Sequence, residues 1–401
     1  MARIRFAIVG TGYVADNYMF SARQYPDTVE IVRAFDIVPA HAKRFTRTWD
    51  IPTVTSREAF LDGLACDMVI NLTNPASHAE VSAACLEAGF PVYSEKPLAM
   101  EFPDAEKLAA LAAEKGLTLS GAPCNHLGEA AQAIQRTLAQ GHIGKPVLAY
   151  AEADDDLIAL APVHLWKNVS GAPWPREDEF EVGCTLEHVG YYLTWLVCFF
   201  GPIESVTAFA SLQHPGKPVE PGAAEGPDFS VATLKFASGA AARVTCSVVA
   251  PRDHGLKIFG TEGELFAEDC WFYQTPVTYR RWMRVRRRLM LTPWTNKVPL
   301  DPPAVPVKKG STVGMDFIRG PVEAVTAARE GRPSRVATDF VVHVNEAALA
   351  VHHAVGSRSG TYVMTSTCVP PAPIPSPLAA KTEAGYLDRK LPPLLDRLFK
   401  A

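Results

Sequence analysis

The hydrophobic pattern of the chain starts with an apolar run that two glycines interrupt. Residues 3–15 read Arg-Ile-Arg-Phe-Ala-Ile-Val-Gly-Thr-Gly-Tyr-Val-Ala, the pattern of a buried strand, a tight turn and the start of a helix. Gly10 permits the turn, Gly12 lets the backbone approach a diphosphate, and the small Ala15 allows the helix to pack on the strand. The helix N-terminus would then face an anion.

Strand and helix patterns alternate after this turn. The run Asp67–Leu72 is continuously apolar, which is typical of a strand buried in a parallel sheet. Gly89 ends the helix that follows it. The alternation predicts an α/β fold with a doubly wound parallel Rossmann sheet in residues 1–122, whose other strands are 29–35, 52–55, 91–94 and 117–120.

A different pattern begins at residue 123. A helix is predicted over 128–139, and most of the strand patterns that follow alternate between apolar and polar positions. Such strands have one covered face. Residues 123–401 are therefore predicted to form an α+β domain with a large, mostly antiparallel sheet, built from strands near 147–152, 203–211, 229–236, 240–249, 256–260 and 263–268.

Composition limits the function classes. A chain of 401 residues with 48% hydrophobic and 20% charged residues is long enough for two packed domains, and a net charge of −4 gives no reason to expect nucleic acid. Eight cysteines without a C-x-x-C pair suit a reducing compartment. The longest apolar run, within Leu193–Phe200, is too short for a bilayer, and the first strand has no signal region before it. A cytoplasmic protein that does not bind membranes is expected.

Asp36 ends the second predicted strand at about the distance from the glycines that a dinucleotide fold requires. A carboxylate there accepts hydrogen bonds from a ribose 2′-hydroxyl and repels a 2′-phosphate, so NAD is favoured over NADP. The alternative is an ordinary turn aspartate that caps the segment beginning at Pro39.

Two motifs follow later strands: Thr73-Asn74-Pro75 with His78, and Glu95-Lys96-Pro97. With these motifs and the glycine turn, the chain resembles the glucose-fructose oxidoreductase, inositol dehydrogenase and MocA (Gfo/Idh/MocA) family. The resemblance implies that Glu95 contacts the nicotinamide ribose, that Lys96 reaches between nicotinamide and substrate, and that Pro97 is often cis. It also implies oligomerisation through the uncovered face of the large sheet, as a homodimer or homotetramer. The cofactor-binding residues expected on this basis are Gly10, Thr11, Gly12, Tyr13, Val14, Ala15, Asp36, Thr73, Asn74, Pro75, His78, Glu95 and Lys96.

A predicted helix over 185–200 should line the substrate cleft. Relatives usually carry Asp, then Gly two residues on, then a proton-accepting His two further. Aligned on Gly190, this chain has His188 where the Asp is usual and Tyr192 where the His is usual, with Glu187 adjacent. His188 and Tyr192 are four residues apart, so both were expected to approach Lys96. Imidazole titrates nearest neutral pH, and His188 is therefore the preferred general base.

Several further residues could contact substrate. Cys124 and His126 begin the second domain, where a packing role is an equal alternative. A zinc site built from Cys124, His126, Cys184 and His188 has no support from their spacing, and no metal is expected. Trp166 and Trp174 lie in a segment, 157–181, that resembles a substrate lid.

Two other segments leave their roles open. The arginine-rich stretch 280–288 is either a docking surface or, as we prefer, a solvated hairpin. The amphipathic stretch 387–398 would suit a subunit contact.

The function expected from these residues and this resemblance is an NAD-dependent oxidoreductase. It would move a hydride between nicotinamide and a secondary alcohol or ketone of a sugar, cyclitol or related polyol, with Lys96 and His188 or Tyr192 as catalytic residues. Two alternatives stay open: an NAD-retaining enzyme that cleaves a glycosidic bond through transient oxidation, and a catalytically silent NAD-binding regulator.

Overall fold

The structure is a computed structural model that describes residues 2–309, 314–354 and 360–378. The stretch 387–398 lies outside the described residues. In the part of the chain that is described, no helix combines the length and the apolar character needed to cross a bilayer.

The first sheet confirms the predicted doubly wound α/β fold. Its six strands are all parallel and run in the order β3-β2-β1-β4-β5-β6, so the direction of winding reverses between β1 and β4. Ligands of such sheets bind outside the carboxyl ends of the strands at this point. The strands are β1 Ile4–Val9, β2 Val29–Phe35, β3 Thr53–Val54, β4 Met68–Asn71, β5 Val92–Ser94 and β6 Leu119–Gly121.

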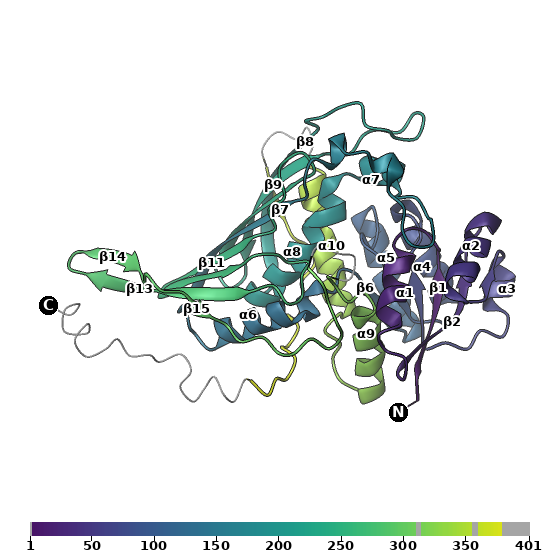
Figure 1. The fold of residues 1–401 in the computed structure, drawn as a ribbon, viewed down its shortest axis with the longest axis horizontal. Coiled ribbons are helices and arrows are strands. Elements are labelled where there is room, and N and C mark those ends of the chain that lie inside the picture. Colours follow the sequence, from purple (N-terminus) through teal and green to yellow (C-terminus); the bar gives the residue numbers. More distant parts are fainter. Residues whose placement is uncertain (1, 310–313, 355–359, 379–401) are drawn as a thin grey trace.

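Helices lie on both sides of this sheet (Figure 1). Two residues mark helix boundaries. Pro39 occupies the first position of α2, where its fixed φ angle suits a helix. Gly116 ends α5 because it adopts the left-handed region of backbone conformation. The helices are α1 Ala15–Ala22, α2 Pro39–Trp49, α3 Arg57–Leu61, α4 His78–Glu87 and α5 Phe102–Lys115, with a 3-10 turn η1 at Pro75–Ser77.

The second sheet has ten strands and is antiparallel except where β7 pairs with β10. The strand order is β14-β13-β12-β11-β7-β10-β9-β8-β16, and β15 pairs with β13. The predicted large, mostly antiparallel sheet is therefore confirmed. The strands are β7 Pro146–Asp154, β8 Ile203–Ser211, β9 Phe229–Phe236, β10 Ala241–Ser247, β11 Leu256–Gly260, β12 Gly263–Ala267, β13 Val277–Val285, β14 Arg288–Leu291, β15 Asn296–Lys297 and β16 Thr361–Val363.

One face of this large sheet is covered by helices and the other is partly exposed. Helix α8 packs on β10 and helix α10 on β8, whereas Phe209 and Phe266 are exposed. The arginine-rich stretch forms the β13–β14 hairpin, which projects from the rest of the chain (Figure 1). The helices of this part are α6 Glu129–Ala139, α7 Arg176–Val182, α8 Cys184–Phe200, α9 Arg319–Glu330 and α10 Thr338–His352, with 3-10 turns η2 Asn125–Leu127, η3 Ile158–Leu160 and η4 Val163–Leu165.

The last helices return to the first sheet. Helix α9 contacts β4 and β6, and helix α10 contacts β6 and α5. The Ser120 hydroxyl donates to the Val336 carbonyl at 2.6 Å, and the Thr338 hydroxyl donates to the Leu119 carbonyl at 2.7 Å. The two sheets are thus joined through a shared apolar core, and the predicted domain boundary at residue 122 stays a prediction.

Candidate active site

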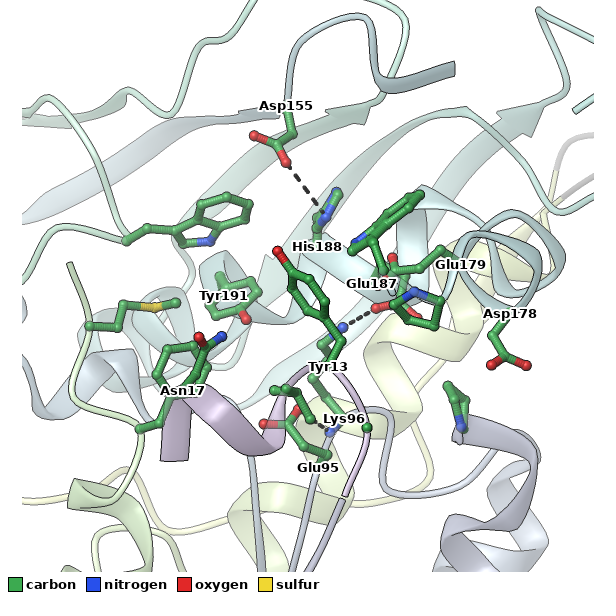
Figure 2. Close-up of a pocket in the computed structure, with 18 of the residues that line it drawn as sticks. Tyr13, Asn17, Glu95, Lys96, Asp155, Asp178, Glu179, Glu187, His188 and Tyr191 are labelled. Atoms are coloured by element: carbon green, nitrogen blue, oxygen red, sulfur yellow. Dashed lines mark hydrogen bonds and ion pairs between the residues drawn. The ribbon is translucent and has the colours of Figure 1, made fainter. Parts of the chain in front are cut away.

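A cavity of about 820 Å³ lies at the carboxyl ends of β1, β4 and β5, between the two sheets. The first sheet contributes the turn that contains Gly12 and the segments around Thr73 and Lys96. The second part of the chain contributes helix α8 with Glu187, His188 and Tyr191, and Asp155 in the loop after β7 (Figure 2). The loops around Arg252 and Trp271 complete this side of the cavity. Both halves of the chain therefore meet at one site.

The glycine turn has the shape that a diphosphate needs. Gly10 has a φ of +89°, and a Cβ built there would lie 2.5 Å from the Leu72 carbonyl oxygen. A Cβ built on Gly12 meets no described atom within 4 Å, because this residue faces open space at the cavity. Helix α1 starts here with Val14 as N-cap, which no side chain of the described chain caps. Its first amides can therefore serve an anion, and these residues fit a dinucleotide.

Asp36 follows β2 and lies against the glycine turn. One carboxylate oxygen accepts from the Thr11 amide at 2.9 Å and from the Thr11 hydroxyl at 2.6 Å, and the other accepts from the Val38 amide at 2.9 Å. The fold thus holds the carboxylate at the edge of the turn. Sequence reasoning missed Arg44 of α2, whose Nη2 donates to the Thr11 carbonyl at 3.3 Å and brings a cation to the same turn.

Two buried side chains hold the segments expected near the nicotinamide ribose. The His78 ring nitrogens lie 2.7 Å from the Pro97 carbonyl and 2.9 Å from the Thr73 carbonyl, so this ring connects the two segments. Burial lowers the pKa of His78, and the contacts to the two carbonyl oxygens oppose this shift. Glu95 accepts from the Tyr18 hydroxyl at 2.7 Å. The peptide bond between Lys96 and Pro97 is cis, as the resemblance implied.

Lys96 reaches across the cavity and forms an ion pair with Glu187 of helix α8. Burial lowers the pKa of Lys96, but the negative charges of Glu187 and Glu179 outweigh it and leave the pKa raised. The ammonium group therefore stays charged at neutral pH. A charged Lys96 can donate a hydrogen bond to a substrate oxygen and polarise it.

Helix α8 presents three residues to the cavity: Glu187, His188 and Tyr191. The expectation that Tyr192 also faces Lys96 is wrong, because Tyr192 is fully buried and its hydroxyl donates to the His254 carbonyl. At about 100° per residue, the three lining residues span an arc of about 100° and Tyr192 lies about 40° beyond it. Alignment on Gly190 placed the cavity face incorrectly, and sequence reasoning missed Tyr191.

His188 is the only histidine of α8, and it faces the Asp155 carboxylate at 3.8 Å through its Nε2. Its Nδ1 has no hydrogen-bond partner among the described residues. Burial, together with the positive charges of Lys96 and Arg252, lowers the pKa of His188 well below its ordinary value. The ring is therefore neutral at pH 7, and its unpaired Nδ1 is buried, so it can accept a proton only where a substrate hydroxyl reaches that nitrogen.

Cys124 and His126 do not reach the cavity. The Cys124 thiol lies 3.6 Å from the Tyr273 hydroxyl, and the buried His126 ring lies 2.9 Å from the Arg335 carbonyl. Burial lowers the pKa of His126 to about 4. The expected substrate contacts of both residues are therefore wrong, and they pack between elements. Within the described ranges, no group of three or more His, Cys, Asp and Glu side chains is arranged to hold a metal ion.

Trp166 and Trp174 line the cavity and pack edge to face, with ring centroids 5.3 Å apart. They are the first and last residues of the segment 166–174, which we call the strap. The strap contacts the first domain beside the glycine turn: the Asn168 amide donates to the Tyr13 carbonyl at 2.9 Å, and the Ser170 backbone N–H donates to Asp16 at 2.7 Å.

Several of the cavity residues that sequence reasoning missed lie in loops after strands. A run of three aspartates, 154–156, directly follows the strand predicted over 147–152, and this position at a strand end was a usable signal for Asp155. The acidic run 176–181 of the predicted lid, whose carboxylates suit substrate hydroxyls, contains two further lining residues, Asp178 and Glu179. No pattern in the sequence pointed to the other missed lining residues, which include Asn17, Tyr191, Arg252, Asp269 and Trp271.

Residues 4–122 match the family described as an oxidoreductase family with an NAD-binding Rossmann fold, and residues 131–266 match the GFO/IDH/MocA C-terminal domain. The chain therefore belongs to the GFO/IDH/MocA family of oxidoreductases. This confirms the resemblance seen in the motifs and, with the glycine turn, makes the first domain an NAD(P)-binding Rossmann domain.

Among curated relatives, trans-1,2-dihydrobenzene-1,2-diol dehydrogenase of Bos taurus is 25% identical over 276 residues, which cover 67% of this chain and 75% of that protein. A putative UDP-kanosamine synthase oxidoreductase subunit of Amycolatopsis mediterranei is 30% identical over 152 residues. This second match spans 37% of the chain and only 42% of that relative.

Solved structures share the fold at low identity. A putative NADPH-dependent oxidoreductase from Desulfitobacterium hafniense aligns with a TM-score of 0.70 and 17% identity, over 88% of this chain and 96% of that chain. The WlbA dehydrogenase from Bordetella pertussis, solved with NADH and UDP-GlcNAcA, aligns with a TM-score of 0.65 and 18% identity over the same shares.

Proposed function

We propose that this protein is an NAD-dependent oxidoreductase that moves a hydride between nicotinamide and a secondary alcohol or ketone of a sugar, cyclitol or related polyol. The observation that carries the proposal is the shared cavity. A glycine turn with room for a diphosphate, a charged Lys96 and a neutral His188 all lie on its walls.

In this proposal, the residues that line the cavity have separate roles. The glycine turn and the start of α1 would hold NAD, which would supply a hydride acceptor for the oxidation of a secondary alcohol. Lys96 donates a hydrogen bond to the reacting oxygen and stabilises the negative charge that develops there, and Glu187 holds the lysine side chain. His188 accepts the hydroxyl proton. Tyr192 has no part in the reaction, because its hydroxyl is buried away from the cavity.

The substrate class rests on the cavity lining and on the relatives. Trp166, Trp174 and Trp271 offer apolar ring faces, and several carboxylates offer acceptors for hydroxyl groups. The names of two similar proteins describe a dehydrogenase of a cyclic diol and a subunit of a UDP-sugar enzyme. A ring that carries hydroxyl groups is common to both descriptions.

The preference for NAD over NADP rests on Asp36, whose carboxylate lies where it would repel a 2′-phosphate. Arg44 acts in the opposite direction, since a guanidinium beside the same turn attracts phosphate. We give Asp36 the larger weight because it is held by three hydrogen bonds at the turn itself.

The test is to incubate the purified protein with NAD or NADP and a panel of sugars, cyclitols and cyclic diols. We expect reduced nicotinamide absorbance with at least one polyol. Lys96→Ala should lose about 10²-fold to 10⁴-fold in turnover and still bind NADH. Lys107→Ala is the matched control, because Lys107 is an exposed lysine on α5.

Near-normal turnover by Lys96→Ala would refute the assignment of that residue. Release of a free sugar without net reduction of NAD would instead identify the glycosidic-bond alternative. Cofactor binding without any turnover would identify the regulator.

A further inference from the structure

A row of alternating imidazole and carboxylate groups begins at the proposed general base. In order of contact, its members are His188, Asp155, His254 and Asp269; His188, Asp155 and Asp269 line the cavity, and His254 is buried. Asp155 uses one oxygen toward His188 Nε2 at 3.8 Å and the other toward His254 Nε2 at 3.6 Å. His254 then uses its second nitrogen, Nδ1, toward Asp269 at 3.5 Å. Every contact joins an imidazole nitrogen to a different carboxylate oxygen.

Arg252 and Trp271 fix this row from outside. The Arg252 guanidinium forms ion pairs with Asp155 at 2.8 Å and Asp269 at 3.3 Å, so it bridges the two carboxylates. The Trp271 ring packs edge to face against His254 at 4.3 Å and against His188 at 5.5 Å. Because Asp155 is held by a guanidinium, its carboxylate has a defined place beside His188.

The His254 ring nitrogens face only the two carboxylates of the row in the described structure. The His254 side chain is 2% exposed, and neither ring nitrogen has a hydrogen-bond partner among the described residues. A buried ring without partners costs about 1–3 kcal/mol, which favours shortening the contacts to Asp155 and Asp269. Hydrogen bonds of catalytic groups are often long without substrate and shorten in the reacting complex.

The charges around His188 show what Asp155 contributes. Accepting a substrate proton turns the His188 ring into an imidazolium, and two cations, Lys96 and Arg252, oppose that change. Glu187 offsets Lys96, whereas Asp155 both offsets Arg252 and lies beside the ring that becomes positive. The titratable and charged groups that face His188 are Lys96, Asp155, Glu179, Glu187, Arg252, His254 and Asp269.

We propose that Asp155 is the positioning residue of His188: it accepts a hydrogen bond from the His188 ring, holds one ring orientation and stabilises the imidazolium that forms during alcohol oxidation. This rests on the proposed function, in which the substrate C–H bond breaks toward nicotinamide and the O–H proton moves to His188. His254 contacts the second carboxylate oxygen of Asp155, and Asp269 contacts the other ring nitrogen of His254. None of these three residues touches the reacting atoms in this mechanism.

The test compares Asp155→Asn with Asp156→Asn. Asp156 is the next residue, is exposed and has a positive φ of 61° that asparagine tolerates. Its carboxylate accepts from the Arg252 backbone N–H at 3.1 Å, and an asparagine carbonyl oxygen can keep this hydrogen bond, so the variant matches the change in charge without removing a contact. For Asp155→Asn we expect kcat to fall about 10²-fold, with KM and the NADH dissociation constant within about threefold. The acid limb of the kcat profile should move to lower pH, because the imidazolium loses its counter-charge. Asp156→Asn should match the unchanged protein.

A second measurement does not need turnover. In protein labelled with ¹⁵N-histidine and assigned with His188→Gln, we expect His188 to carry its proton on Nε2, and Asp155→Asn to shift the ring toward the other tautomer. If Asp155→Asn fails to fold, His254→Gln replaces it, with an expected loss of about tenfold in kcat.

The outcomes separate this proposal from the proposed function. If the wild-type protein oxidises a polyol and Asp155→Asn has the same rate and pH profile, the role of Asp155 is overturned. The oxidoreductase proposal then stays intact. If the wild-type protein oxidises no polyol, the proposed function fails, and the ¹⁵N experiment alone decides the His188–Asp155 contact. An unchanged tautomer in Asp155→Asn then overturns it.

Discussion

Release of the reduced cofactor should depend on Asn168 in the strap. The Asn168 side chain makes three hydrogen bonds: its amide donates to Tyr13 at 2.9 Å, and its carbonyl accepts from the Ser170 hydroxyl at 2.9 Å and from the Ala172 amide at 2.8 Å. The first contact joins the strap to the glycine turn, and the other two hold the shape of the strap. Asn168→Ala removes all three.

The magnitude follows from these contacts. Only the bond to Tyr13 joins the strap to the turn, so at about 1 kcal/mol the ratio of closed to open forms falls about fivefold; the two bonds within the strap are lost in both forms. If NADH leaves only from the open form, its dissociation rate constant rises by up to that factor.

Stopped-flow fluorescence of bound NADH, chased with excess NAD, measures this rate constant. Val169→Ala is the control, because Val169 lies between the two contact residues and is 67% exposed. A dissociation rate of Asn168→Ala within twofold of the control, in protein that melts at the same temperature, would show that the strap does not hold the cofactor.

Further predictions concern the turn, the cofactor and the base. Gly10→Ala should lower the free energy of unfolding by about 3 kcal/mol or more, measured by urea denaturation, because its Cβ would meet the Leu72 carbonyl and its φ is positive; an unchanged midpoint would contradict this. NAD should bind more tightly than NADP in titration calorimetry, and Asp36→Ala should narrow the difference; tighter binding of NADP to the unchanged protein would contradict the preference. The rate of alcohol oxidation should fall on the acid side with a midpoint below 6.5, the ordinary pKa of histidine, because burial and nearby cations favour the neutral ring of His188; His188→Asn should remove this limb.

The sequence was informative wherever a local rule determines the structure. The six parallel strands follow from apolar runs between turn residues, and the roles of Gly10 and Asp36 follow from backbone geometry at a single turn. Lys96 also lines the cavity as expected, since a residue at the carboxyl end of a parallel strand must lie at that edge of the sheet.

The site was predicted less well where tertiary packing determines which side chains reach the cavity. The rotation of α8 about its axis depends on how it packs against β10, and a rotation of about 40° would bring Tyr192 to the cavity in place of Glu187. Arg252 and Trp271 lie about 100 residues beyond the strand end that carries Asp155, so no local spacing connects them. His126 was a candidate substrate contact in the sequence, with packing as an equal alternative, and the structure shows it as a core histidine beside a carbonyl.

The return of α9 and α10 to the first sheet has a consequence for synthesis of the chain. The hydrogen bond between Ser120 and Val336 spans 216 residues, and at about 5–20 residues per second a ribosome needs roughly 10–40 s to make that stretch. During this time the nascent Rossmann sheet lacks the helices that later pack beside β6, and its apolar surface there stays open to chaperones or to other nascent chains. Folding of the cofactor domain is therefore completed only near the end of translation, and fragments that stop before α9 are expected to aggregate although they contain every strand of the first sheet.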